Sequence, residues 1–166
     1  MSQAPRHLKL WRRLPPADRQ AWSGLLRVYR SLVPRLDAQL EREHRLPLSH
    51  YDVLVQLANA PEGLRMGQLA EEVLLSPSGL TRLVDRLVGE GLVERRPGAT
   101  DVRQTYVAIT PRGLDLVADA TATHLRAVRD LFLDRLDPEE KAVLARAFTR
   151  VLDTQTPPTT ATASRS

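Results

Sequence analysis

The feature that most constrains this chain is the stretch 64–113, which predicts two consecutive short helices and then an arginine-bearing hairpin, with no long loop between them. Over 66–73 the apolar residues recur at i, i+3, i+4 and i+7, the spacing that puts them on one helical face. At the start of the second helix, the Ser76 hydroxyl can accept a hydrogen bond from an unpaired backbone N–H, and Pro77 suits the first helical position. This order of elements is typical of a winged helix-turn-helix.

The second predicted helix has an apolar face and a polar face. Its apolar stripe, which stops before Gly89, consists of Leu80, Leu83, Val84 and Leu87. The opposite face carries small hydroxyls and guanidinium groups, which suit the base edges and phosphates of a DNA major groove. The residues expected to contact DNA from this helix and its start are Ser76, Ser78, Gly79, Thr81, Arg82 and Arg86.

The hairpin is predicted from two strand-like segments, 92–96 and 104–109, separated by residues with the composition of a turn. Arg96, Asp101 and Arg103 lie at or near its tip, where we expect them to contact DNA. A carboxylate two residues before an arginine can hold the guanidinium extended, which suits entry into a narrow, electronegative minor groove. Alternatively, Asp101 and Arg103 form a solvated ion pair that stabilises the hairpin only slightly.

The hairpin and its flanks resemble the wing signature of the MarR family of bacterial transcription regulators. The matching runs are 91–97, 100–103 and 107–113, and the helix 78–87 precedes them. Similarity of pattern extends over residues 17–153, although only the central stretch of about 50 residues carries identifiable motifs. The resemblance implies a homodimer, in most members a repressor, whose affinity for a palindromic operator is lowered by a small ligand or by oxidation.

Three wing residues match the family's pattern position by position. Arg95 corresponds to the arginine that follows the recognition helix, so the resemblance adds it to the expected DNA contacts. Asp101 and Arg103 correspond to the wing-tip pair. Val102 departs from the basic residue often found between them, which removes one candidate phosphate contact.

The composition favours a single domain with a helical interior, so together with the predicted hairpin we expect a mainly α fold with a two-stranded β-wing. Of 166 residues, 42% are hydrophobic and only 4% aromatic, which indicates a helical interior packed with Leu, Val and Ala. No apolar run could span a bilayer and the polar start lacks a signal-peptide core, so we expect a cytoplasmic protein that associates with the nucleoid when bound to DNA. The absence of cysteine excludes disulfides and thiol-based peroxide sensing, and with them the redox branch of the family.

Helical patterns flank the winged module on both sides. In the first flanking helix apolar side chains repeat at helical spacing, and Pro34 is expected to bend it. After the wing, Thr110 with Pro111 opens a long helix, and the acidic segment 137–140 opens a last one. These helices carry more apolar surface than one winged module covers, so we expect them to intertwine with a second copy of the chain. The alternative is an intramolecular bundle.

The sequence therefore predicts five segments. The first contains four basic residues around Trp11, which form either a basic arm along the DNA backbone or a frayed terminus. Within the winged module, Ser49 and Asp52 resemble a capping box that opens a helix. The segments are a basic arm (1–16), an N-terminal dimerisation helix (17–46), the winged module (47–113), C-terminal dimerisation helices (114–153) and a disordered tail (154–166).

An effector pocket in this family lies between the dimer helices and the winged module. The candidate ligand-binding residues are therefore Trp22, Tyr29, His50, Tyr51 and Asp52, together with Arg82. A tryptophan with an acidic residue and arginines is similar to the urate-responsive members and favours an aromatic or anionic ligand. Alternatively, Trp22 and Tyr29 pack in the dimer interface and Asp52 caps a helix. The partners expected are double-stranded DNA, a second copy and this small-molecule effector, with no membrane contact.

Enzymatic chemistry has little support, because no Gly-rich phosphate loop or nucleophile elbow is present and no cofactor is implied. The four histidines are scattered, at His7, His44, His50 and His124. A metal-sensing regulator is the main alternative, since His44, His50 and Glu41 or Glu43 could converge with His124. A third possibility is a module whose winged domain packs on another protein, and the arginine-bearing wing argues against it.

Overall fold

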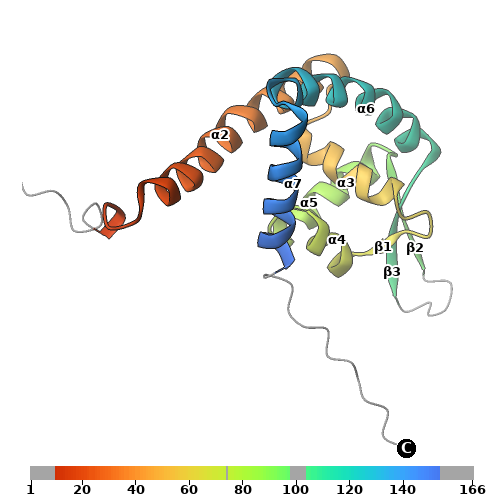
Figure 1. The fold of residues 1–166 in the computed structure, drawn as a ribbon. Coiled ribbons are helices and arrows are strands. Elements are labelled where there is room, and N and C mark those ends of the chain that lie inside the picture. Colours follow the sequence, from red (N-terminus) through yellow and green to blue (C-terminus); the bar gives the residue numbers. More distant parts are fainter. Residues whose placement is uncertain (1–9, 74, 98–103, 154–166) are drawn as a thin grey trace, which may run out of the picture. The chain divides into compact units, whose positions relative to one another are not determined.

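The computed structural model describes residues 10–73, 75–97 and 104–153 (Figure 1). The chain divides into two compact units, Met1–Ala127 and Val128–Ser166. In chain order the elements are α2 (Pro16–His44), α3 (Leu48–Ala58), β1 (Leu64–Arg65), α4 (Met66–Glu72), α5 (Pro77–Gly89), β2 (Val93–Pro97), β3 (Thr105–Ile109), α6 (Pro111–Leu131), the 3-10 turn η1 (Leu133–Arg135) and α7 (Pro138–Asp153). Over the described ranges, none of these helices is long and apolar enough to cross a membrane.

The first unit contains the winged helix-turn-helix that the sequence predicts. Helices α4 and α5 follow one another, and β2 and β3 form an antiparallel hairpin in which Val93 pairs with Ile109. The short strand β1 pairs with the other edge of β3, with Leu64 opposite Val107, so the strand order is β1, β3, β2. The expected wing had two strands. The third was missed because a strand of two residues has no periodicity from which to predict it.

Helix α5 begins and packs as its sequence predicts. The backbone N–H of Gly79 donates to Ser76 Oγ at 3.2 Å, and Pro77 is the first helical residue, where no N–H is needed. The apolar stripe faces the core, with exposed fractions between 0% and 9% for Leu80, Leu83, Val84 and Leu87. Burial of this stripe leaves the polar face of α5 in solvent.

The core of the first unit also draws on the helices around the winged module. Its fully buried side chains include Leu40 of α2, Leu54 and Leu57 of α3, Leu69 of α4 and Val107 of β3. Among the described residues of α2 only Leu40 is buried, and the helix continues through Pro34. Several large apolar side chains earlier in α2 remain exposed, namely Trp22, Leu25, Val28 and Tyr29.

The start of α3 differs from the predicted capping box. The helix begins at Leu48 after Pro47, so Ser49 lies inside the first turn and is not the capping residue. The N–H of Leu48 donates instead to Asp37 Oδ1 of α2 at 2.8 Å. The prediction placing Ser49 and Asp52 at this cap was wrong because the capping carboxylate comes from the preceding helix, outside the local pattern.

The cap of α6 confirms the prediction for Thr110. Thr110 Oγ1 accepts a hydrogen bond from the Gly113 N–H at 3.1 Å and lies 2.8 Å from the carbonyl oxygen of Gly91, to which it donates. The same hydroxyl therefore starts α6 and fastens it to the turn that follows α5.

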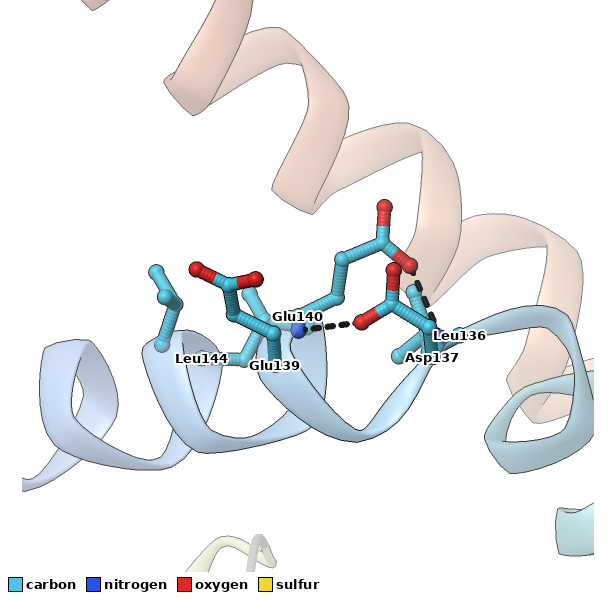
Figure 2. Close-up of a pocket in the computed structure, with 6 residues that line it drawn as sticks. Leu136, Asp137, Glu139, Glu140 and Leu144 are labelled. Carbon is cyan, nitrogen blue, oxygen red and sulfur yellow. Dashed lines mark hydrogen bonds between the residues drawn. The ribbon is translucent and has the colours of Figure 1, made fainter.

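The second unit consists of the end of α6, η1 and α7. At the start of α7, the Asp137 N–H donates to Glu140 Oε2 at 2.9 Å and the Glu140 N–H donates to Asp137 Oδ1 at 2.8 Å (Figure 2). This reciprocal pair is the capping box predicted from 137–140. Beyond it, α7 buries none of its side chains, and the exposed apolar ones include Val143, Phe148, Val151 and Leu152.

Candidate nucleic-acid interface and adjoining pocket

The polar face of α5 presents hydrogen-bonding groups to solvent. Ser78, Thr81, Arg82 and Arg86 are all exposed. Thr81 Oγ1 donates to the carbonyl oxygen of Pro77 at 3.0 Å, which leaves its lone pairs for a donor outside the chain. Among the described residues no carboxylate pairs with Arg82, so its guanidinium can bind an external acceptor.

Three other arginines expected to contact DNA are held by carboxylates. Arg95 Nη2 donates to Asp85 Oδ1 at 2.7 Å, and Arg96 Nε donates to Glu94 Oε1 at 2.6 Å. On α5, Arg86 Nε donates to Glu90 Oε1 at 3.0 Å, a pair four residues apart on the helix. Because all three pairs are largely solvent-exposed, each stabilises the fold by about 0–1 kcal/mol. Their main effect is to orient the guanidinium groups.

The wing tip lies between the ends of β2 and β3. Asp101 and Arg103, the pair expected to enter the minor groove, are outside the described residues, as are Arg6 and Lys9 of the expected basic arm. The strands on either side are described, and Arg96 sits opposite Tyr106 in the hairpin register. The expectation for the wing-tip pair therefore stays a prediction.

An open pocket of about 260 Å³ is lined by residues of α3 and α5 and by Leu75. His50 lies in its wall, and His50 Nε2 is buried without a hydrogen-bond partner among the described residues. Burial lowers the pKa of His50, and the nearby charge of Arg86 lowers it further. The pocket thus combines an imidazole of lowered pKa with two guanidinium groups. Its lining residues are Ser49, His50, Leu75, Gly79, Arg82, Leu83 and Arg86.

Two of the other candidate ligand residues face α6. The ring of Tyr51 packs against that of His124, with centroids 4.8 Å apart, and Tyr51 Oη lies 3.2 Å from Thr121 Oγ1. Desolvation raises the pKa of Asp52 although part of its side chain reaches solvent, while the charge of His124 opposes that rise. Burial in turn lowers the pKa of His124. Tyr51 and Asp52 thus lie where α3 packs against α6.

Trp22 and Tyr29 lie on α2 with 52% and 54% of their surface exposed. Neither lines the pocket that contains His50. Of the predicted ligand residues, the described part of one chain therefore brings together only His50 and Arg82. No local pattern predicts that Ser49, Leu75 and Arg86 line this pocket, because pocket membership depends on how α3 packs against α5.

The histidines are distributed over separate contacts. His44 Nε2 lies 2.9 Å from Thr123 Oγ1, whose hydroxyl donates to Glu43 Oε2 at 3.0 Å and fastens α2 to α6. This hydrogen bond lowers the pKa of Glu43. In the parts of the chain that the structure describes, no three His, Asp or Glu side chains are grouped to hold a metal ion. The metal-sensing alternative gains no support from this arrangement.

Comparison with known proteins identifies the same module. A family model described as the MarR family matches residues 45–104. The chain is 28% identical over 127 residues to the HTH-type transcriptional regulator MhqR of Bacillus subtilis, covering 76% of this chain and 86% of that protein.

Solved structures extend the match over most of the chain. A MarR family transcriptional regulator from Streptomyces coelicolor in complex with DNA has a TM-score of 0.79 and 30% identity, and the match covers 87% of this chain and 95% of that one. CouR from Rhodococcus jostii, bound to p-coumaroyl-CoA, has a TM-score of 0.69 and 27% identity over 80% of this chain and 91% of that one.

These similarities agree with the geometry of the module, in which the helix α5 presents an exposed polar face and is followed by an arginine-bearing wing. The curated relatives with which the chain shares most of its length are transcription regulators, a class without enzymatic activity. The chain therefore belongs to the MarR family of winged helix-turn-helix regulators and is a DNA-binding transcription regulator.

Proposed function

We propose that this regulator is a homodimeric repressor that binds a pseudo-palindromic operator and is released from it by a small aromatic or anionic ligand. The observation that carries the proposal is the position of Arg82 and Arg86. Both belong to the exposed face of α5 and to the wall of the pocket that contains His50. A ligand that engages these guanidinium groups competes with DNA for the same side chains.

The chemistry of the pocket supports the ligand class. Two guanidinium groups favour an anion such as a carboxylate, which arginine binds through paired hydrogen bonds. Leu75 and Leu83 give the wall an apolar part, which suits a flat hydrocarbon ring. His50 Nε2, buried and without a partner among the described residues, is available for a hydrogen bond to the ligand.

For the described residues, the DNA contacts that we propose are supported by the exposure of α5 and β2 side chains, whereas Asp101 and Arg103 enter the proposal from the sequence alone. Ser78, Thr81 and Arg82 on α5 would read base edges in the major groove, with Arg82 as the candidate bidentate donor to a guanine. Ser76, Gly79, Arg86, Arg95 and Arg96 would add backbone contacts, and Asp101 would position Arg103 in the minor groove.

The homodimer is supported by apolar side chains that the chain leaves exposed. On α2 these include Trp22 and Leu25, and on α7 they include Phe148 and Leu152. A second copy could cover both sets, as the exposed apolar surface of a protomer is usually covered in an oligomer. The dimer would place two α5 helices on half-sites about 10 bp apart.

The test begins with selection of bound duplexes from a random library by the purified chain. We expect a pseudo-palindrome, and we expect Arg82→Ala to weaken its binding by about 1–3 kcal/mol and to relax specificity at one position. Arg146→Ala on α7 removes an exposed arginine that is not among the predicted DNA contacts and serves as the matched control. Binding by Arg82→Ala that equals the parent in affinity and selectivity would rule out base reading by this residue.

Ligand release is tested with a panel of aromatic carboxylates and phenols. Compounds that raise the melting temperature are added to the protein–DNA complex, and anisotropy of the labelled duplex reports dissociation. We expect release to saturate and to require a higher ligand concentration in His50→Ala. A compound that stabilises the protein through this pocket and leaves the duplex bound would contradict competition for α5. Repression itself is checked by a reporter placed behind the selected duplex.

A further inference from the structure

The outer face of the winged sheet carries a row of three side chains, one from each strand. Arg65 of β1 is opposite Tyr106 of β3, and Tyr106 is opposite Arg96 of β2. Residues in register point to the same face of a sheet, so these three side chains project together. Figure 1 shows β1 beside the strands that lead to the wing tip. Only one further pair, Pro97 with Thr105, separates this row from the tip.

The guanidinium of Arg65 is oriented by two neutral amides. Arg65 Nη1 donates to Gln104 Oε1 at 3.1 Å, and Nε donates to Gln68 Oε1 at 3.4 Å. Gln68 Oε1 also accepts from the Arg65 backbone N–H at 3.0 Å, which ties the side chain to the first turn of α4. The two amide bonds use two of the five N–H donors of the guanidinium and leave both N–H groups of Nη2 for another acceptor.

The charge of Arg65 distinguishes it from the neighbouring arginines. Arg95 and Arg96 face the carboxylates of Asp85 and Glu94, whereas no carboxylate of the described residues lies within ion-pair distance of Arg65. Amides fix the direction of a guanidinium without neutralising it. Arg65 is therefore exposed and oriented near the wing, and no carboxylate of the described residues pairs with it.

We propose that Arg65 binds a backbone phosphate of the DNA beside the groove that the wing enters. This inference rests on the proposed DNA-binding mode and adds to it a contact made from the start of α4. A guanidinium edge with two free N–H groups matches the oxygens of a phosphate. The contact carries no base information, so it fixes the register of the protein on the duplex and raises affinity for every sequence alike.

The test uses the full chain and the duplex selected above, with binding measured by anisotropy between 50 and 200 mM salt. Each phosphate contact contributes about 0.9 to the slope of log affinity against log salt. Arg65→Gln should therefore lower the slope by about 0.9 per bound protomer, and its affinity deficit should shrink about 3.5-fold per protomer over this salt range. The deficit should be equal on the selected duplex and on an unrelated one.

Two further variants separate a phosphate contact from other causes. Arg42→Gln removes an exposed arginine on α2 and should leave the slope unchanged, which controls for net charge. Arg65→Lys keeps the charge and should keep most of the slope. If Arg65→Gln binds with the parent's slope, the inference is wrong. It is also wrong if Arg65→Gln lowers the melting temperature and Arg65→Lys does not restore binding, because Arg65 then only stabilises the fold of the wing. Failure of the parent chain to bind any duplex would instead refute the proposed function.

Discussion

Arg95 on the wing strand β2 donates to Asp85 on the recognition helix α5, with 2.7 Å between Nη2 and Oδ1. The two elements that we propose contact DNA are thus joined directly by a charged hydrogen bond. Both side chains are partly exposed, at 36% and 57%. The pair therefore contributes little to the free energy of unfolding, and its value lies in fixing the wing relative to α5.

The first prediction tests the ion pair between Asp85 and Arg95. Asp85→Ala removes a negative charge, which by itself strengthens attraction to any DNA. Loss of orientation has the opposite effect on a duplex that requires helix and wing together. We expect Asp85→Ala to bind the selected duplex more weakly and an unrelated duplex at least as tightly, as measured by anisotropy. Tighter binding to both duplexes would show that Asp85 is only a repulsive charge.

A double-mutant cycle with Arg95→Ala then measures the coupling between the two side chains. For the folded state, chemical denaturation should give a coupling of about 0.2–1 kcal/mol, as for other exposed ion pairs. For DNA binding, the coupling should be larger on the selected duplex than on the unrelated one. If the coupling is negligible on both duplexes, the Asp85–Arg95 pair has no role in DNA recognition.

The second prediction concerns Gly113 at the start of α6. A Cβ at this position would collide with the Leu92 carbonyl oxygen and would stand 2.7 Å from Ile109 Cγ1. Gly113→Ala should therefore lower the free energy of unfolding by about 1–3 kcal/mol or more, because a backbone carbonyl cannot move aside cheaply. Denaturation at a fixed protein concentration measures this loss.

Gly89→Ala is the matched control for that substitution. Apart from its chain neighbours and the nearby backbone of its own helix, no heavy atom of the described residues lies within 4 Å of a Cβ built on Gly89, and this residue ends α5. The variant should be neutral or more stable by up to about 1 kcal/mol, because alanine loses less conformational freedom in a helix. If both alanine variants behaved alike, the close approach at Gly113 would not limit stability.

Local patterns in the sequence were enough to predict the helix starts that depend on nearby residues. The Ser76 cap, the Thr110 cap and the Asp137 capping box each join groups three residues apart, and each is confirmed. The apolar stripe of α5 was likewise predictable, because burial of one helical face follows from the spacing of its leucines.

Contacts between distant segments were not predictable in this way. The Asp37 carboxylate caps α3 from the preceding helix, and Asp85 meets Arg95 only once the hairpin has folded against α5. Similarly, Thr123 joins Glu43 from 80 residues away. No periodicity encodes such pairs, so the sequence predicted which arginines contact DNA but not that Asp85 would orient Arg95.

The third prediction concerns the pH dependence of stability through His124. Burial holds the pKa of His124 below its usual value of 6.5, so the unfolded chain takes up a proton before the folded chain does. Stability is therefore fully present above pH 6.5 and falls as the pH drops from 6.5 toward the lowered pKa, by at most about 1.4 kcal/mol per pH unit. His50 adds a change of the same sign.

His124→Phe keeps a ring against Tyr51 and removes the titration. The variant should show a smaller fall in melting temperature between pH 7.5 and pH 5.5 than the parent. Asp52 has the opposite effect on stability. Its pKa is raised above the usual value of 3.8, so as the pH falls the folded chain takes up this proton before the unfolded chain does, which favours the folded state. A parent and a His124→Phe variant with the same pH profile would show that this imidazole is not protonated on unfolding.

The last prediction tests the exposed apolar face of α7 as part of the proposed dimer. Phe148 is 45% exposed within one chain, so Phe148→Glu costs little if the chain is monomeric. In a dimer that covers α7, the same change buries an unpaired charge and should shift the protein toward monomers, as measured by sedimentation at several concentrations.

Arg146 lies two residues away and, at 100° per residue, on nearly the opposite side of the helix, so Arg146→Glu is the matched control and should stay dimeric. If both variants sediment as the parent does, α7 lies outside the dimer interface. If Phe148→Glu alone dissociates, binding to the selected duplex should lose its dependence on two half-sites, because each monomer then carries one α5.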